Sequence, residues 1–415
     1  MSSNIIFLFD LDGTLTLEEM LPQVAKAFGI NEQINNLTQE TMNENIPFIE
    51  SFIKRVEILK HIHVSSISNL LESVKLASLV VNFIQQNSEQ CYIVTENLTE
   101  WVEILIKKIG CKFFASMGDV QNDQLIKLTK IIKKEDIVKH FKNQGKTVVF
   151  IGDSNNDSEA MRESDISVAC GITHYPAKSI LSFVDYAVFT EDSLVRLLCQ
   201  IQNRKPGKSI VLSCAGIGSR LGLGQSKALI ELHGKKLIEI QLESFKDFND
   251  IRIVVGFQSN DIINTVLKIR KNVIFVYNHD YFHTKTGASY YLGARYANEY
   301  SIAWDGDLLV HPEDVEKCLN YDGEYVGCSS IVSDNPVYVQ TNDGDKAIGF
   351  SYDSGKLEWS GPACLKSSKV KYVTTNVFNQ LEEWLPITIL KIRARDIDTY
   401  EDYRHALEFT KEWQN

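Results

Sequence analysis

The feature that most constrains the fold of this chain is the alternation of short apolar runs with helix-like stretches. In the first half of the chain each run is nearly continuous and ends at a polar turn, which is typical of parallel strands covered by helices on both faces of a sheet. The predicted strands are 5–9, 91–94, 113–116, 147–151, 166–170 and 186–189. Between residues 17 and 70 the pattern is helical, so we expect an all-helical insertion after the first strand.

The alternation begins again after a basic link, NRKPGK, at 203–208. The predicted strands of this second part are 209–213, 251–255, 273–277 and 301–304. A chain of 415 residues is too long for one ordinary core, which predicts two domains. We therefore expect two α/β domains in series, each a Rossmann-like three-layer fold, at 1–202 and 209–415.

The charge balance narrows the range of partners. The chain has 43 Lys and Arg against 54 Asp and Glu, a net charge of −11. This argues against non-specific binding of nucleic acid and of anionic membrane surfaces, and it suits small-molecule substrates. The run 5–9 is too short for a signal peptide, and no apolar stretch is long enough to span a bilayer. The eight cysteines are scattered without a C-x-x-C pair, so we expect reduced thiols in a cytoplasmic protein.

Polar residues follow the predicted strands of the first domain, at the carboxyl ends of the strands, where α/β proteins bind ligands. They are Asp10 and Asp12 in DLDGT, Thr95, and Asp153 and Asp157 in GDSNND, with Lys134 near the start of a helix. Crowded carboxylates repel one another unless a cation lies among them, and oxygen-only ligands favour Mg²⁺. A carboxylate can also attack a phosphoryl group and form an aspartyl-phosphate. Lys134 and Thr95 would then stabilise the phosphoryl oxygens, and Asp12 would act as acid and base.

This set of motifs resembles the haloacid dehalogenase superfamily of phosphatases over about the first 200 residues. The resemblance implies that Asp10 is the nucleophile, that Asp12 protonates the leaving group and then activates water, and that insertion 17–70 is a substrate-selecting cap. The implied Mg²⁺ ligands are Asp10, the backbone carbonyl of Asp12, Asp153 and Asp157. The simpler alternatives are a turn role for Asp10 and Asp12, a helix N-cap role for Thr95 and a solvated side chain for Lys134.

A glycine-rich loop follows the first strand of the second domain, in the sequence SCAGIGSRLGLGQSK. Four glycines within nine residues predict backbone amides wrapped around phosphates, and two basic residues add the cations that a triphosphate needs. The spacing fits neither a Walker loop nor a Rossmann fingerprint. The predicted nucleotide contacts are Ala215, Gly216, Gly218, Ser219, Arg220 and Lys227, with catalytic roles for Arg220 and Lys227.

From about residue 209 onward the chain resembles nucleoside-triphosphate transferases, namely sugar-phosphate nucleotidylyltransferases and bacterial-type choline-phosphate cytidylyltransferases. The matching segments are the glycine-rich loop, 253–257, 278–294, 304–309 and 396–403. The resemblance implies that Asp307 and Asp398 hold Mg²⁺ while the basic residues of the loop neutralise departing pyrophosphate. The family usually has proline before Lys227, where this chain has Ser226. For Asp305, a turn role and a supporting role in the site stay open.

Aromatic residues of the second domain are candidates for substrate selection. A pocket lined by aromatic rings and carboxylates would suit a cationic amine, although packing in the core is the simpler role for large rings. The candidates are Tyr281, Tyr290, Tyr291, Trp304 and Trp359.

The sequence therefore predicts a bifunctional enzyme, a Mg²⁺-dependent phosphatase fused to a nucleotidyltransferase that uses CTP. The expected acceptor is a small phosphate or phosphonate, and the expected products are activated head groups or surface polysaccharide precursors. A phosphonate acceptor would escape the phosphatase, because an aspartate nucleophile of this kind does not cleave a C–P bond. The alternatives are a sugar-1-phosphate uridylyl- or guanylyltransferase, a phosphomutase in place of the phosphatase, and a chain with one non-catalytic, regulatory domain. The acceptor, the phosphatase substrate and the oligomeric state stay open.

Overall fold

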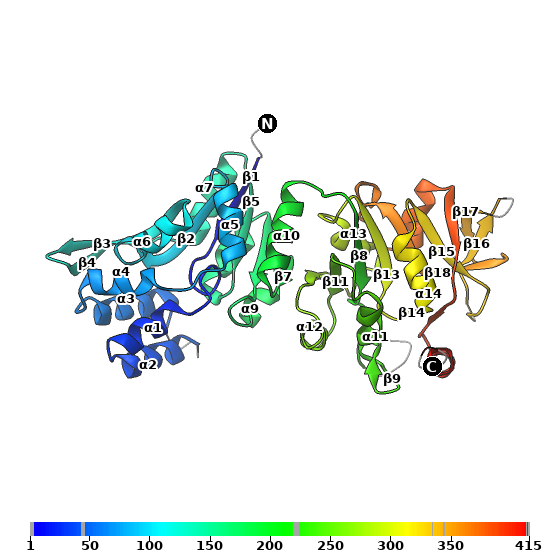
Figure 1. The fold of residues 1–415 in the computed structure, drawn as a ribbon, viewed down its shortest axis with the longest axis horizontal. Coiled ribbons are helices and arrows are strands. Elements are labelled where there is room, and N and C mark those ends of the chain that lie inside the picture. Colours follow the sequence, from blue (N-terminus) through cyan, green and yellow to red (C-terminus); the bar gives the residue numbers. More distant parts are fainter. Residues whose placement is uncertain are drawn as a thin grey trace. The chain divides into compact units, whose positions relative to one another are not determined.

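The computed structural model describes residues 4–42, 46–218, 224–333, 335–342, 345–411 and 413. The chain divides into two compact units, Met1–Val195 and Arg196–Asn415, whose elements are labelled in Figure 1. Helix α10 (Glu191–Gln202) crosses this division. Both units combine a sheet with helices, so the predicted α/β fold class is confirmed.

The first unit is built around a sheet with the strand order β7-β6-β5-β1-β2-β3-β4. Neighbouring strands are parallel except for β3 and β4, which form an antiparallel hairpin. The strands are β1 Ile5–Phe9, β2 Cys91–Leu98, β3 Lys112–Gln121, β4 Gln124–Lys130, β5 Thr147–Gly152, β6 Ile166–Cys170 and β7 Tyr186–Val188. All six predicted strands are present, and β4 is additional because its sequence, QLIKLTK, is largely polar and mostly exposed.

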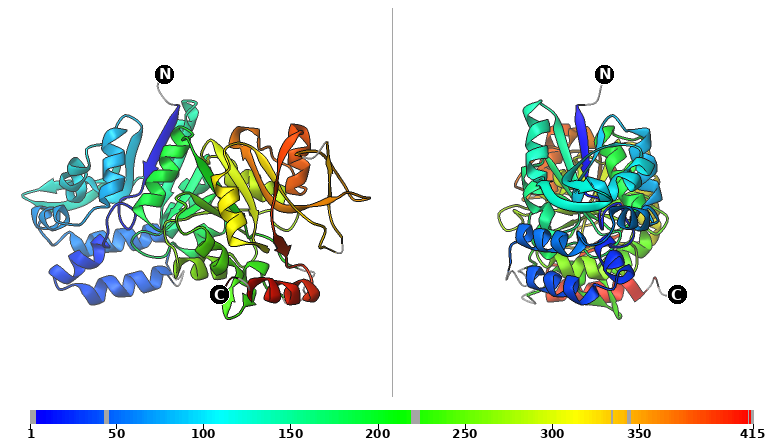
Figure 2. Two further views of the ribbon diagram at one scale, coloured as in Figure 1. Left: turned by 45° about the vertical axis from the view of Figure 1, so that its right-hand side comes forward. Right: turned by 90° about the vertical axis from the view of Figure 1, so that its left-hand side faces the viewer.

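Helices fill the connections of the first unit. The segment after β1 is helical, and Figure 2 shows its four helices in blue as one group. The helices are α1 Met20–Ala27, α2 Asn31–Met42, α3 Phe48–Leu59, α4 Val64–Glu72, α5 Ser78–Gln86, α6 Thr99–Ile109, α7 Lys134–Asn143, α8 Ser158–Glu163 and α9 Lys178–Leu181. An isolated bridge pairs Thr16 with Leu76 where this segment leaves and rejoins the sheet. The β3–β4 turn reaches α4, because Asp123 accepts a hydrogen bond from the Ser65 backbone N–H at 2.8 Å.

The second unit has a mixed sheet with the strand order β15-β19-β17-β16-β18-β13-β8-β11-β12. The four predicted strands form its parallel part: β8 Lys208–Ser213, β11 Ile251–Val255, β12 Ile274–Tyr277 and β13 Tyr300–Asp305. The remaining strands were not predicted: β15 Tyr325–Ser329, β16 Tyr338–Thr341, β17 Lys346–Ser351, β18 Leu357–Lys366 and β19 Ile387–Lys391. Of these, β18 joins the parallel part through an antiparallel pairing with β13.

Two short ribbons and several helices complete the second unit. One ribbon pairs β14 (Leu308–Val310) with β20 (Ala394–Asp396), and the other pairs β9 (Glu231–Leu232) with β10 (Lys235–Lys236). The helices after α10 are α11 Leu237–Ser244, α12 Ser259–Leu267, α13 Thr286–Ala294, α14 Pro312–Asn320, α15 Val377–Leu381 and α16 Tyr400–Lys411.

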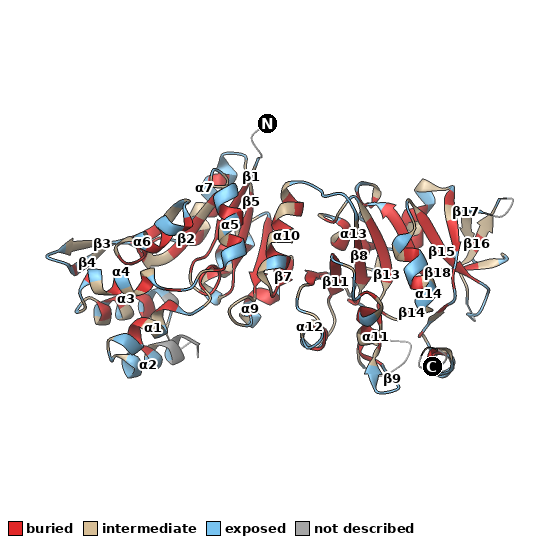
Figure 3. Ribbon diagram, viewed as in Figure 1, coloured by how far each residue is buried: buried red, intermediate tan, exposed pale blue. Residues whose placement is uncertain are grey.

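The central strands of each unit are buried, as the red segments of Figure 3 show. In the second unit Trp304 packs edge-on against Phe245, with 5.0 Å between ring centroids. Tyr290 is also buried, and its hydroxyl donates a hydrogen bond to the Ser301 carbonyl at 2.9 Å. These two aromatic candidates therefore belong to the core and not to a pocket. In the part of the chain that the structure describes, no helix combines the length and apolar character needed to cross a membrane.

Candidate active sites

The first candidate site lies where the central strands of the first unit end. Phe9 in β1 is level with Ile93 in β2 on one side and with Ile151 in β5 on the other. The residues that follow these three positions therefore lie together at the carboxyl ends of the strands. This register explains why Asp10, Thr95 and Asp153, which are far apart in the sequence, are all buried at the same end of the sheet.

Lys134, the first residue of α7, is surrounded by carboxylates and is only 1% exposed. Its Nζ lies 2.8 Å from Asp10 Oδ1, 2.7 Å from Asp157 Oδ1 and 3.0 Å from Glu96 Oε2. Burial by itself lowers the pKa of Lys134, but the three carboxylates outweigh burial and hold the pKa well above its usual range. The alternative of a solvated lysine is therefore wrong.

Asp153 and Asp157 complete the acidic cluster. Asp157 Oδ2 accepts hydrogen bonds from the backbone N–H groups of Asp153 and Ser154 at 3.0 and 3.1 Å, which holds the loop after β5 in a tight turn. Asp153 Oδ1 accepts the Thr14 hydroxyl at 2.5 Å, and Asp153 Oδ2 lies 3.0 Å from His174 Nε2. Both aspartates are therefore fixed by neutral or cationic donors.

The cluster has the composition of a divalent-metal site. One carboxylate oxygen from each of Asp10, Asp153 and Asp157 lies within 4.8 Å of the others, and all three residues are buried. Burial and the neighbouring carboxylates raise the pKa of Asp10 well above its usual range, which Lys134 only partly offsets. A hard cation with oxygen ligands would reduce the repulsion between these carboxylates, so the residues fit a metal ion.

Asp12 lies beside the cluster and is held in place by two hydrogen bonds. Its Oδ1 accepts a hydrogen bond from the Met20 backbone N–H at 2.8 Å and one from the Thr16 hydroxyl at 3.3 Å. Burial is the main cause that raises the pKa of Asp12 to about 7, and Glu19 adds to it. A carboxyl group with this pKa can both carry and release a proton near neutral pH.

Gly13 is required by the turn between Asp10 and the insertion. Its φ of +76° lies in the left-handed region, and a Cβ at this position would be 2.7 Å from Asp153 Oδ2. Glycine therefore lets the backbone approach Asp153 closely.

Four residues of this site were missed in the sequence: Glu19, Glu96, Asn156 and His174. His174 Nε2 lies 2.8 Å from Glu19 Oε1 as well as beside Asp153, and these contacts raise its pKa to about 11. Asn156 donates a hydrogen bond to Glu96 Oε2 at 2.8 Å. Asn156 stands inside the quoted GDSNND motif, so its position was the one available signal for it.

Thr95 is buried at the end of the regular part of β2, where its hydroxyl oxygen accepts hydrogen bonds from Asn97. The strand continues through a bulge to Leu98, and Leu98 is the N-cap of α6. Thr95 is therefore not the N-cap of that helix.

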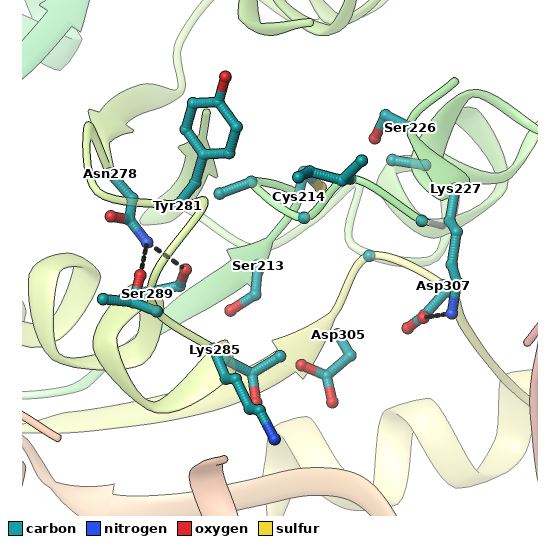
Figure 4. A pocket seen from close by; sticks show the side chains of 18 of the residues that line it. Ser213, Cys214, Ser226, Lys227, Asn278, Tyr281, Lys285, Ser289, Asp305 and Asp307 are labelled. Atoms are coloured by element: carbon teal, nitrogen blue, oxygen red, sulfur yellow. Dashed lines mark hydrogen bonds and ion pairs between the residues drawn. The ribbon is translucent and has the colours of Figure 1, made fainter. Parts of the chain in front are cut away.

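The second candidate site is a cavity of about 380 Å³ at the carboxyl ends of β8 and β13. Figure 4 shows Lys227 and Asp307 facing each other at one side of this cavity, with 2.7 Å between Nζ and Oδ2. The same ammonium group also contacts Asp398 Oδ1. The carboxylates raise the pKa of Lys227 above its usual range against the effect of burial.

The β14–β20 ribbon explains how the two aspartates meet. Leu308 pairs with Asp396, and the Ile397 backbone N–H donates a hydrogen bond to the Asp307 carbonyl at 3.2 Å. The residues that flank this ribbon, Asp307 and Asp398, thus converge on one cation, here the lysine ammonium group. Two carboxylates that converge on a cation are a suitable pair of ligands for a divalent metal ion.

The glycine-rich loop borders the same cavity through Ala215, Gly216 and Gly218. The predicted contacts Ser219 and Arg220 lie outside the described residues. Ser226, at the position where the sequence resemblance leads us to expect proline, uses its backbone N–H to donate a hydrogen bond to Gln258 Oε1 at 2.8 Å. Proline has no such N–H, which gives a physical reason for a residue other than proline at this position.

Asp305, Ser213 and Lys285 also line the cavity, as seen in Figure 4. Burial, together with Asp307, raises the pKa of Asp305 to about 7. Of the aromatic candidates, Tyr281 borders the cavity, whereas Tyr291 packs against Tyr372 at 5.6 Å. The fifth candidate, Trp359, packs edge-on against Phe350 at 6.0 Å. An aromatic cage for a cationic amine is thus not formed by the five predicted residues.

Comparisons with known proteins match a different family to each half of the chain. Residues 6–165 match the family of haloacid dehalogenase-like hydrolases, and residues 209–333 match the MobA-like NTP transferase domain. The first match contains Asp10, Asp153 and the residues between them, and the second contains the glycine-rich loop and Asp307. Both resemblances predicted from the sequence are confirmed.

Curated relatives match the first half of the chain. A phosphoserine phosphatase from Archaeoglobus fulgidus is 23% identical over 205 residues, which is 46% of this chain and 58% of that protein. A phosphoserine phosphatase from Methanocaldococcus jannaschii is 24% identical over 178 residues, covering 40% of this chain and 84% of that protein. The chain thus spans little more than half the length of the first of these relatives.

Solved structures resemble each half separately. A CTP:phosphocholine cytidylyltransferase from Streptococcus pneumoniae is 22% identical and covers 49% of this chain and 99% of its own, with a TM-score of 0.41. A substrate-bound phosphoserine phosphatase structure is 20% identical and covers 47% of this chain and 96% of its own, also with a TM-score of 0.41.

Proposed function

Because the chain joins a haloacid dehalogenase-like hydrolase domain to an NTP transferase domain, we propose that it is a bifunctional, Mg²⁺-dependent enzyme. The first domain hydrolyses a small phosphomonoester through an aspartyl-phosphate. The second transfers a nucleotidyl group, CMP from CTP, to a small phosphate or phosphonate. The observation that carries this proposal is that each domain gathers aspartates around one lysine at the carboxyl ends of its strands.

The phosphatase step uses four side chains of the first site. Asp10 attacks the phosphorus and forms a P–O bond, while the ester oxygen leaves with a proton from Asp12. Asp12 then takes a proton from a water molecule that attacks the aspartyl-phosphate, which releases inorganic phosphate and restores Asp10. Lys134 and Thr95 stabilise the charge on the phosphoryl oxygens. Mg²⁺, held by Asp10, Asp153 and Asp157, neutralises negative charge in this cluster when it is bound.

The transferase step joins acceptor and nucleotide in the second site. An acceptor oxygen attacks the α-phosphorus of the nucleoside triphosphate, and the bond to pyrophosphate breaks so that pyrophosphate leaves with the electron pair. Lys227 stabilises the charge of the phosphates, together with the backbone amides of the glycine-rich loop. Asp307 and Asp398 would hold Mg²⁺, which shields negative charge between the two reactants. Lys227, which lies beside both aspartates, is placed to donate hydrogen bonds to phosphate oxygens of the bound nucleotide.

The finer assignments rest on weaker support. CTP is favoured by the sequence resemblance to choline-phosphate cytidylyltransferases in the glycine-rich loop and in 278–294. Phosphoserine is the first phosphatase substrate to test, because the matched relatives are named phosphoserine phosphatases. A phosphonate acceptor would let both domains work on one chain without conflict, and the products would be head-group or polysaccharide precursors. If the transferase turns over only phosphomonoesters, the proposal of a phosphonate acceptor is wrong.

The test is a matrix of four nucleoside triphosphates against a panel of acceptors, with pyrophosphate and inorganic phosphate measured separately. The panel contains phosphocholine, phosphoethanolamine, 2-aminoethylphosphonate, phosphoglycerols, sugar 1-phosphates and phosphoserine. We expect pyrophosphate release with CTP that is lost in Asp307→Asn, and phosphate release that is lost in Asp10→Asn. Each variant is the matched control for the other activity. Turnover with UTP or GTP would favour a sugar nucleotidylyltransferase, and an isomer without free phosphate would identify a phosphomutase.

A further inference from the structure

One carboxylate of the first site has no role in the proposed phosphatase step. Glu96 follows Thr95 in β2, and its Oε2 lies 3.0 Å from Lys134 Nζ. The same oxygen accepts the hydrogen bond from Asn156 Nδ2 at 2.8 Å. Two donors from separate elements, α7 and the turn after β5, therefore converge on a single carboxylate oxygen.

All three N–H donors of the Lys134 ammonium group have a carboxylate partner in this arrangement. The other two partners, Asp10 and Asp157, lie at 2.8 and 2.7 Å. Asp10 is the proposed nucleophile, and Asp157 is fixed by two backbone N–H groups of its own turn. If Lys134 keeps its contacts with Asp10 and Asp157, the contact that it can exchange for a phosphoryl oxygen is the one with Glu96.

Glu96 is also the most exposed of the three carboxylates that contact Lys134. Its side chain is 14% exposed, against 5% for Asp10 and 0% for Asp157. A partly exposed carboxylate can regain water when it turns outward, so its displacement costs less than that of a buried one.

Building on the proposed phosphatase function, we infer that Glu96 Oε2 occupies the position that a phosphoryl oxygen takes when a phosphate ester binds. A phosphate ester binds by displacing Glu96 from Lys134 and Asn156, which then donate to the phosphoryl oxygen. Glu96 is therefore an internal competitor that weakens the affinity for phosphate esters and for the product, inorganic phosphate. It neither attacks nor transfers a proton.

The test compares Glu96→Gln and Glu96→Ala with the wild type and with a control, Glu103→Gln. Glu103 of α6 has a side chain that is 46% exposed, pairs with Lys107 at 3.0 Å and is not one of the three carboxylates beside Lys134. Binding of inorganic phosphate to the full chain with Mg²⁺ is measured by calorimetric titration, and phosphate inhibition of ester hydrolysis is measured beside it. In both Glu96 variants the charged carboxylate no longer competes with phosphate for Lys134 and Asn156. We therefore expect these variants to bind phosphate about tenfold more tightly than the wild type, and the control to bind it with the affinity of the wild type.

Two results would overturn the inference. Unchanged affinity in the Glu96 variants would mean that phosphate binds elsewhere than at these donors. Weaker affinity would mean that Glu96 positions Lys134 for phosphate instead of competing with it. If the wild type hydrolyses no ester at all, the proposed phosphatase function fails, yet the titration with phosphate still decides this inference. Glu96→Gln keeps the size of the side chain, so it serves if Glu96→Ala does not fold.

Discussion

Replacing Lys134 with methionine should destabilise the first unit more than any exposed lysine replacement. The substitution leaves Asp10, Asp157 and Glu96 without the ammonium group that lies within 3.0 Å of each of them. Removing one partner of a buried ion pair costs about 3–5 kcal/mol, because the remaining charge stays buried and uncompensated. For a unit of this size each kcal/mol corresponds to about 2–4 °C, so the melting temperature should fall by about 6–20 °C.

The loss should depend on pH in a defined direction. Burial raises the pKa of Asp10, and Lys134 opposes this rise. Without Lys134 the pKa of Asp10 in the folded state rises further above its unfolded value, so the folded state binds more protons than the unfolded state. Stability of the variant therefore falls as pH rises through this window, and its deficit relative to the wild type should be larger at pH 8 than at pH 5.

The measurement must report on the first unit alone. Urea unfolding in EDTA, followed by hydrogen exchange and mass spectrometry of peptides from β1 and β5, separates this unit from the second. The control is Lys139→Met, since Lys139 is exposed on α7 and lies 3.5 Å from Glu163, and its effect should stay within about 0.5 kcal/mol. Equal unfolding midpoints for the two variants, or full phosphatase activity in Lys134→Met, would refute the reasoning.

Three further outcomes follow from other contacts. Asp12 must carry a proton to protonate the leaving group, so with a pKa of about 7 the rate of ester hydrolysis should decline above neutral pH. In a pH–rate profile, Asp12→Asn should abolish this decline and slow turnover by about 10²–10⁴-fold. Gly13→Ala forces a Cβ within 2.7 Å of Asp153 Oδ2, so Mg²⁺ affinity measured by calorimetry should fall, and unchanged affinity would contradict this placement. Ser226→Pro removes the hydrogen bond to Gln258, so the second unit should lose about 1 kcal/mol in urea unfolding, whereas Ser226→Ala should not.

Much of the first site could be predicted because its residues follow strands that are plain in the sequence. Apolar runs locate the strands, parallel pairing brings their ends together, and polar residues at those ends are brought together as a result. Lys134 does not follow one of these strands but begins a helix, as expected, and it was named as a candidate through the resemblance to haloacid dehalogenase phosphatases. The partners Glu96, Asn156 and His174 were missed because nothing in a single sequence tells which side chain after a strand turns inward and meets a charge from another element.

The second unit was less predictable for a different reason. Its antiparallel strands, such as β16 and β17, are partly exposed and carry mixed polarity, so they lack the continuous apolar signal of β8 and β11. The aromatic candidates also show that a sequence pattern does not tell which side chains line a site. Tyr290 and Trp304 are large rings near a predicted site, but their burial in the core follows from packing that the sequence pattern does not encode.

The β14–β20 ribbon has a consequence for the order in which the two activities arise during synthesis. The first site draws on residues from Asp10 to His174, so all of its parts exist when less than half of the chain has left the ribosome. The second site waits for Asp398, which the ribbon brings beside Asp307 across a long stretch of chain. Because domains generally fold as units during synthesis, a nascent chain would complete the first site, with its proposed hydrolytic activity, well before the second site with its proposed transferase activity.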